Sequence, residues 1–274
     1  SSTMLVGRGN TEEHDIIFPK SKLSYIYLLF KSGIAQRFNK LQITSNKGYH
    51  SCSLFPTNIH KKINKSNYDL VNLHWVQGEF ISIESIGKIT KPVVWTLHDT
   101  WAFSGSEHYP IDINDKRYKE VYSSSNRPKN HKALDIDKWC WNRKLKSWKN
   151  NFHIVTPSKW LGDMAKDSYL LRNFSIHNIP NAIDTDVFKP VDRYLARSLF
   201  NLPKSKNLIL FGAFSSLNDH RKGLDLLLKA LVNLESKSND MEVVILGGSK
   251  IIQDLKLKFK FHFIPKLTDD FSLS

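Results

Sequence analysis

Short apolar runs alternate with amphipathic stretches along most of the chain. Four runs are bounded by proline or polar residues, as expected of buried strands, and they cover residues 69–76, 92–99, 151–158 and 174–181. Residues 80–89 have a helical pattern, and Ser158 is placed to cap a helix that begins with "KWLGDMAKDSYLL". Buried strands separated by helices predict a parallel sheet that is covered on both faces.

Residues 181–207 interrupt this pattern with two prolines and polar turn residues, and they indicate a crossover between two domains. The pattern then restarts with a helix over 222–234 and with strands over 207–214, 241–248 and 259–267. We therefore predict an α/β protein with two doubly wound parallel-sheet domains, over residues 1–190 and 191–274. Because such a sheet usually has about five or six strands, we expect the second domain to be incomplete.

Composition narrows the class of protein. The chain is 41% hydrophobic and 24% charged, which is typical of a globular protein, and it has no apolar run of the roughly 18 residues that a membrane span needs. Its two cysteines, Cys52 and Cys140, form neither a disulfide framework nor a zinc pattern, so we expect a cytoplasmic protein. The net charge of +14 favours anionic partners, although a lysine-rich surface alone gives the same value.

Two cations stand at a predicted helix start that closely follows a strand. Gly212 lies near the end of the strand, and the helix begins with Arg221, Lys222 and Gly223. A helix N-terminus binds anions, and open parallel sheets bind ligands beyond the carboxyl ends of their strands. This pattern predicts a diphosphate site, and the alternative is a pair of solvated helix residues.

A second group of candidates lies at strand ends in the first domain. His98 and Asp99 end one predicted strand and are the catalytic candidates. His74 and Trp75 end the strand before it and, with Trp101, are the candidates for binding the acceptor. Trp101 follows closely, and aromatic faces can stack on a sugar. The alternatives are ordinary core packing for the tryptophans and a half-buried, hydrogen-bonded role for His74.

Residues 137–152 combine aromatic and basic side chains. A helix there would have one aromatic face and a basic remainder, which is the pattern of a helix that lies on an anionic membrane; the aromatic face comprises Trp141, Leu145, Trp148 and Phe152. Such a helix would place the protein at the inner face of the cytoplasmic membrane. The alternative is a packed helix with a solvated basic face.

Four motifs occur in order: "TLHDTWAFSGSEHY", "IVTPSKWLGDMAKDSYLL", "IPNAIDTDVFKP" and "LILFGAFSSLNDHRKGLDLLLKAL". Together they resemble the family 4 retaining glycosyltransferases of GT-B fold, particularly the branch that builds bacterial surface polysaccharide. The resemblance implies two Rossmann-like domains, the first for the acceptor and the second for a nucleotide-sugar donor. It implies transfer of the sugar, with retention, to a glycan or lipid-linked glycan, with no cofactor and no metal.

The resemblance also implies roles for individual residues. Lys222 would hold the donor diphosphate, and His98 would face the donor sugar. The leaving phosphate, rather than His98, would deprotonate the acceptor. Positive side chains and a helix dipole would stabilise the leaving diphosphate, which agrees with the diphosphate site predicted from the helix start.

The chain also departs from the family pattern. Ala213 stands where the family usually has an arginine, and neither the glutamate pair of the second domain nor the N-terminal glycine-rich loop occurs. We therefore expect an internal portion of such an enzyme, truncated at both ends. An inactive chain that binds acceptor or a partner stays open as an alternative. A basic nucleic-acid-binding protein is disfavoured, because the sequence has no helix-turn-helix, zinc or RNP-like motif.

Overall fold

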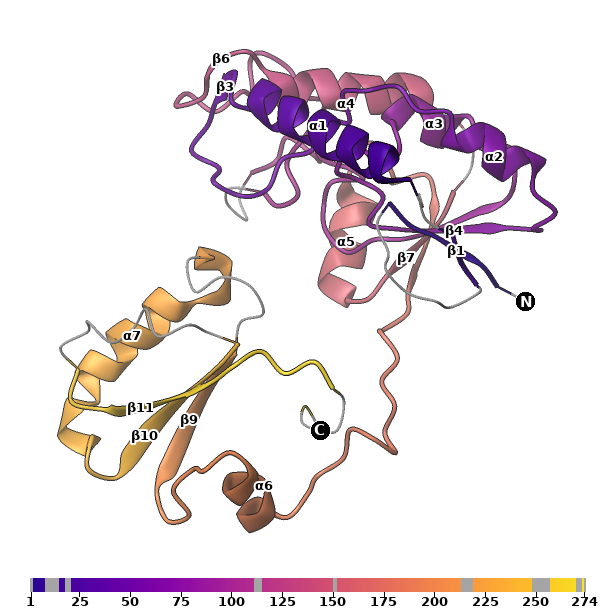
Figure 1. The fold of residues 1–274 in the computed structure, drawn as a ribbon. Helices are drawn as coiled ribbons and strands as arrows, with labels where there is room; N and C mark the ends of the chain where they lie inside the picture. Colours follow the sequence, from indigo (N-terminus) through magenta and orange to yellow (C-terminus); the bar gives the residue numbers. More distant parts are fainter. Residues whose placement is uncertain are drawn as a thin grey trace. The chain divides into compact units, whose positions relative to one another are not determined.

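The computed structural model describes residues 2–7, 15–17, 21–110, 115–149, 152–212, 219–247, 257–269 and 273. The chain divides into two compact units, Ser1–Asn181 and Ala182–Ser274, and each is described here by itself (Figure 1). The division falls inside the predicted crossover over residues 181–207. That a domain over residues 1–190 binds the acceptor and a domain over residues 191–274 binds the donor stays a prediction.

The first unit is built on a four-stranded parallel sheet. Its four strands correspond to the four predicted runs and lie side by side in chain order; they are β4 (Val71–His74), β5 (Val93–Thr96), β7 (Phe152–Thr156) and β8 (Ser175–Asn178). His74 pairs with Thr96, and Thr96 pairs with Val155. The carboxyl ends of the strands therefore meet at one edge of the sheet.

Helices cover both faces of this sheet (Figure 1). One face carries α1 (Lys22–Asn39), α2 (Ile59–Lys65), α3 (Ile83–Gly87) and α4 (Ile136–Ser147), and the other carries α5 (Lys159–Asp167). The predicted cap of α5 is confirmed, because the Ser158 hydroxyl accepts a hydrogen bond from the Leu161 N–H at 3.2 Å. Two short strand pairs complete the unit: β1 (Met4–Leu5) with β2 (Ile16–Ile17), and β3 (Gln42–Ile43) with β6 (Lys132–Ala133).

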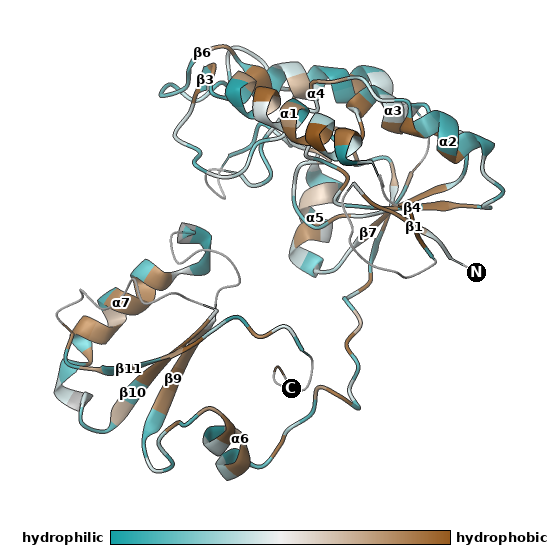
Figure 2. Cartoon of the chain, in the orientation of Figure 1, coloured by the Kyte–Doolittle hydropathy of each residue, from teal (hydrophilic) through white to brown (hydrophobic). Residues whose placement is uncertain are grey.

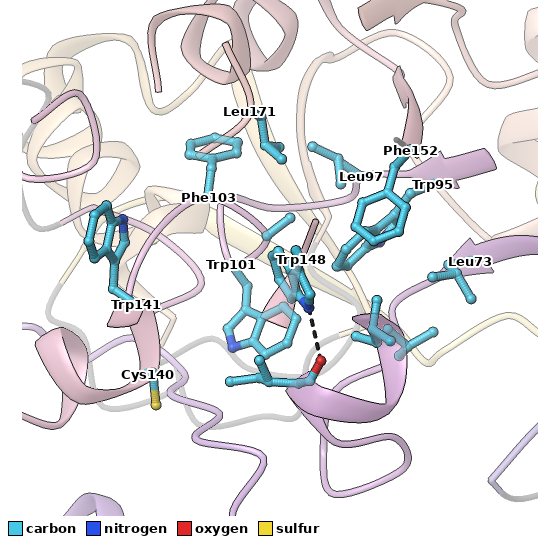
Figure 3. Packing of buried hydrophobic residues seen from close by; sticks show 14 of the residues in the cluster. Leu73, Trp95, Leu97, Trp101, Phe103, Cys140, Trp141, Trp148, Phe152 and Leu171 are labelled. Atoms are coloured by element: carbon cyan, nitrogen blue, oxygen red, sulfur yellow. Dashed lines mark hydrogen bonds between the residues drawn. The ribbon is translucent and has the colours of Figure 1, made fainter. Parts of the chain in front are cut away.

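The core of the first unit is rich in aromatic side chains (Figure 3). The Trp95 and Trp148 rings pack edge to face with their centroids 5.1 Å apart, and Phe152 packs against both. The buried indole N–H of Trp148 donates to the Ile83 carbonyl at 2.9 Å. This hydrogen bond satisfies the polar atom of the side chain while its ring joins α4 to β5.

The second unit repeats the parallel pattern. Its sheet has the order β11-β10-β9, formed by β9 (Asn207–Gly212), β10 (Met241–Leu246) and β11 (Lys260–Ile264). The helix α7 (Leu224–Asn233) packs on one face of this sheet, where Leu231 lies against the fully buried Val243 and Ile245. Apolar residues of α7 and the strands lie along this contact (Figure 2). The predicted crossover also contains a short helix, α6 (Arg193–Leu199), which the sequence analysis missed.

We expect the change Trp148→Ala to destabilise the first unit by about 3–5 kcal/mol, because it leaves a large cavity and an unpaired carbonyl at Ile83. The matched control is Trp160→Ala, since Trp160 is 52% exposed. The free energy of unfolding, measured in urea, tests this. A loss for Trp148→Ala that is no larger than the loss for Trp160→Ala would contradict it.

Candidate functional site

Two histidines meet at the carboxyl edge of the first sheet. His74 ends β4, and His98 lies two residues beyond the end of β5. The Nδ1 atom of His74 and the Nε2 atom of His98 are 3.0 Å apart, and both residues are exposed to solvent. The structure thus brings together two of the residues that the sequence analysis proposed for a site.

The environment of His74 favours its neutral form. Although the residue is exposed, its imidazole is partly removed from water, and this desolvation is the first cause that lowers its pKa from the ordinary value; the neighbouring charge of His98 is the second. In a neutral pair one imidazole donates the shared hydrogen bond and the other accepts it. The second ring nitrogen of each histidine is then left to bind a ligand hydroxyl at this edge.

Asp99, unlike the neighbouring His98, is held inside the fold. It is buried, and its carboxylate accepts a hydrogen bond from the Trp101 N–H at 3.0 Å. Its second oxygen lies 2.6 Å from Nδ1 of the buried His108, whose Nε2 lies 2.9 Å from the Ser51 hydroxyl. The catalytic prediction for Asp99 is therefore corrected, because this carboxylate positions the loop after β5.

The prediction that Trp101 binds the acceptor is also corrected. Its side chain is 0% exposed, and its indole N–H donates to the Ser51 carbonyl at 2.7 Å. The Lys144 ammonium lies 3.8 Å from the centroid of its ring. No ring face is left for an acceptor, so Trp101 belongs to the core. Trp75, by contrast, is 49% exposed.

The predicted membrane-binding helix over residues 137–152 is wrong. The helix α4 ends at Ser147, and Phe152 belongs to the strand β7. Trp141, Trp148 and Phe152 are all buried in the core, so their rings cannot enter a lipid surface. None of the helices that the structure describes is both long enough and apolar enough to cross a membrane.

The sequence analysis missed the role of Lys144. This lysine is fully buried, and its ammonium donates hydrogen bonds to the carbonyls of Trp101, Ser104 (3.1 Å) and Gly105 (2.6 Å). Burial lowers its pKa to about 7. The surrounding "NRKLKSWKNN" resembles a solvated basic face, so the sequence contains no signal that separates Lys144 from its neighbours.

The second unit places a cationic turn before α7. Residues His220–Lys222 form a short 3-10 helix, and Gly223 precedes α7 with a left-handed φ of 76°. The Lys222 side chain is exposed, and none of the residues that the structure describes pairs with its ammonium. The Arg221 guanidinium binds both carboxylate oxygens of Asp219, at 2.9 and 2.7 Å, and lowers the pKa of that carboxyl.

The backbone explains why a glycine stands at one of the two glycine positions proposed for the donor site, but not at the other. A Cβ atom on Gly223 would be strained by the left-handed backbone, so the turn itself explains that glycine. A Cβ atom on Gly212 would meet only the Leu246 side chain, at 3.9 Å, which is an ordinary contact. Packing among the described residues therefore does not require a glycine at position 212, and ligand access stays a reason for it.

Comparison with known proteins identifies the family. The family model described as Glycosyltransferase Family 4 matches residues 17–187. The chain belongs to glycosyltransferase family 4. Membership implies a retaining glycosyltransferase with a nucleotide-sugar donor and an acceptor, and the parallel α/β architecture of both units agrees with the GT-B fold. No curated protein matches this glycosyltransferase.

We expect His98→Gln to raise the pKa of His74 without restoring the ordinary value of 6.5. Glutamine removes the charge of position 98, but burial, the larger cause of the shift, remains. Titration of the imidazole NMR signals tests this, with His153→Gln as the control because His153 is exposed on β7. An unchanged His74 pKa, or one above 6.5, would contradict the expectation.

Proposed function

We propose that this glycosyltransferase transfers a sugar from a nucleotide diphosphate to a glycan or lipid-linked glycan in the synthesis of surface polysaccharide. The anomeric configuration of the sugar is retained, as in its family. The reaction takes place in the cytoplasm and needs no metal. Two free, buried cysteines, Cys52 and Cys140, support a reducing compartment.

The start of α7 carries the proposal for the donor site. Lys222 is exposed in the turn before the helix, and Gly212 ends β9 at the carboxyl edge of the sheet on which α7 packs. Gly247, with φ of 77°, follows β10 at that edge. An ammonium and a helix N-terminus at one sheet edge favour a diphosphate. The same groups would stabilise the charge that develops on the leaving diphosphate.

The two cations at this turn have different proposed roles. Because the Asp219 carboxylate already binds the Arg221 guanidinium, Arg221 would contribute less positive charge to a diphosphate than Lys222. Arg221 instead holds the turn in the shape that presents Lys222. Gly223 allows the left-handed backbone between the turn and α7.

His98 is proposed to hydrogen-bond the donor sugar. It is exposed at the carboxyl edge of the first sheet, and His74 orients its ring from 3.0 Å. An imidazole held in this way can bind a sugar hydroxyl and stabilise positive charge that develops at the anomeric carbon. The leaving phosphate accepts the proton of the acceptor hydroxyl.

Calorimetric titration of the chain with UDP, GDP and ADP tests the donor site. We expect one of the three to bind with micromolar affinity, and Lys222→Ala to weaken it by at least about tenfold, since a lost ionic contact to phosphate costs roughly 1.5–3 kcal/mol. Lys229→Ala is the matched control, because Lys229 is exposed on α7 within the same helix.

The outcomes separate the enzyme from an inactive binding chain. If a folded chain binds none of the three nucleotides, the proposed donor site is wrong. If both lysine variants lose affinity equally, the effect is general charge and not a site at Lys222. A chain that binds nucleotide but transfers no sugar to any acceptor would support the inactive alternative.

A further inference from the structure

Two carboxyl groups are buried together where the loop after β5, residues 99–109, meets α4. Glu107 is 6% exposed and Asp137 is 3% exposed, and both line a cavity of about 10 Å³, which has room for about one water molecule. Among the described residues, no lysine or arginine forms an ion pair with either carboxyl. Ionisation of both groups would therefore place two negative charges together in a buried site, which is strongly unfavourable.

The environment of Asp137 stabilises its charged form. Its Oδ1 atom accepts hydrogen bonds from the N–H group (3.3 Å) and the hydroxyl (2.5 Å) of Ser106, and its Oδ2 atom accepts one from the Gln42 amide at 2.6 Å. Nδ1 of His50 lies 3.6 Å from the same Oδ1 atom. Burial alone would raise the pKa of Asp137, but hydrogen bonds from its neighbours, with His50 first, outweigh burial and hold that pKa well below its ordinary value. Asp137 is therefore the ionised member of the pair.

Glu107 has fewer donors than Asp137. The Tyr122 hydroxyl donates to its Oε1 atom, while its buried Oε2 atom receives no hydrogen bond from the described residues. The side chains of Glu107 and Asp137 are nevertheless hydrogen-bonded to each other. An ionised carboxylate can only accept, so this bond requires a proton on one partner, and that partner is Glu107. Burial, followed by the charge of Asp137, accordingly raises the pKa of Glu107 well above its ordinary value.

Other titratable groups surround the pair but do not neutralise it. They come from the segments before and after the loop and from α4, and they are His50, Asp115, Arg117, Tyr122, His131 and Lys144. The Arg117 guanidinium pairs with Asp135 at 2.9 Å, and the Lys144 ammonium donates to three carbonyls of the loop. The proton on Glu107 is thus the direct means by which the pair avoids a second negative charge.

The carboxyl pair joins the loop to α4 at a point of close approach. A Cβ atom on Gly105 would lie 2.6 Å from the Asp137 backbone, so the loop and the helix are in direct contact there. The loop begins directly after His98, whose Nε2 atom lies 3.0 Å from Nδ1 of His74. The state of the carboxyl pair therefore affects the segment that follows a candidate site residue.

We propose that a single proton, held by Glu107 and shared with Asp137, latches the loop after β5 to α4. While the proton is present, a carboxylic acid donates to a carboxylate, and the pair carries one negative charge. When the proton leaves, two carboxylates face each other without a cation, and the loop moves away from α4 to admit water. The latch belongs to the first unit and does not depend on the proposed donor site.

The raised pKa of Glu107 sets the direction of the pH dependence. The folded chain holds this proton more tightly than the unfolded chain. The stabilisation is therefore complete below the ordinary pKa of 4.5 and is lost as the pH rises through the raised pKa. Lys144 acts in the opposite direction, because burial lowers its pKa to about 7 and stability then rises with pH above that value. A variant at position 107 separates the two contributions.

Carbon-13 NMR of the chain labelled at its glutamate carboxyl carbons tests the proton directly. We expect one carboxyl signal to remain that of a protonated acid at neutral pH and to disappear in Glu107→Gln. Glu120→Gln is the matched control, because Glu120 is exposed in the segment after the loop and its variant should lose an ionised signal instead. An ionised Glu107 at neutral pH would overturn the proposal. If Glu107→Gln does not fold, correlation with backbone signals assigns the Glu107 carboxyl in the unmodified chain.

Unfolding in urea tests the latch itself. From slightly acidic to alkaline pH, the urea midpoint of the unmodified chain should fall relative to that of Glu107→Gln, because the glutamine amide donates to Asp137 at every pH. Glu120→Gln should follow the unmodified chain. Hydrogen exchange at the Ser106 N–H, which donates to Asp137, should be faster at alkaline pH in the unmodified chain than in Glu107→Gln. Parallel midpoints for these two chains, or equal exchange at Ser106, would rule out a latch at this pair.

Discussion

The ammonium of Lys144 organises the loop that follows β5. It donates to the carbonyls of Trp101, Ser104 and Gly105, and the loop closes so tightly on α4 that a Cβ atom on Gly105 would lie 2.6 Å from the Asp137 backbone. Without the lysine, three buried carbonyls would lose their donor, at about 1–3 kcal/mol each. The loop therefore needs both a buried cation and a glycine.

This closed loop determines which side chains reach the surface of the first unit. It buries Trp101 and brings His108 back to Asp99, which immediately precedes the loop. His108 then supports Tyr49 and Trp75, while His98, just before Asp99, stays exposed beside His74. Residues that are neighbours in the sequence thus divide between a rigid support and an accessible edge.

The placement of the candidate residues follows from the parallel sheets. Parallel strands end at a common edge, so residues that follow separate strands can meet there without any specific pairing signal. His74 and His98 meet in this way in the first unit. In the second unit, Gly212 and Gly247 mark the corresponding strand ends, and α7 contributes its N-terminus. The same topological rule thus accounts for both proposed binding regions.

Hydrophobic periodicity along the chain was sufficient to predict the seven strands of the two larger sheets, the helices α5 and α7 and the carboxyl-edge position of His74 and His98. Periodicity reports which residues face an apolar layer. It could not separate Trp75 from Trp101, or Lys144 from the exposed lysines near it, because identical side chains carry identical local signals. Their exposure depends on long-range contacts such as that between Lys144 and the Gly105 carbonyl, and these exist only once α4 packs against the loop.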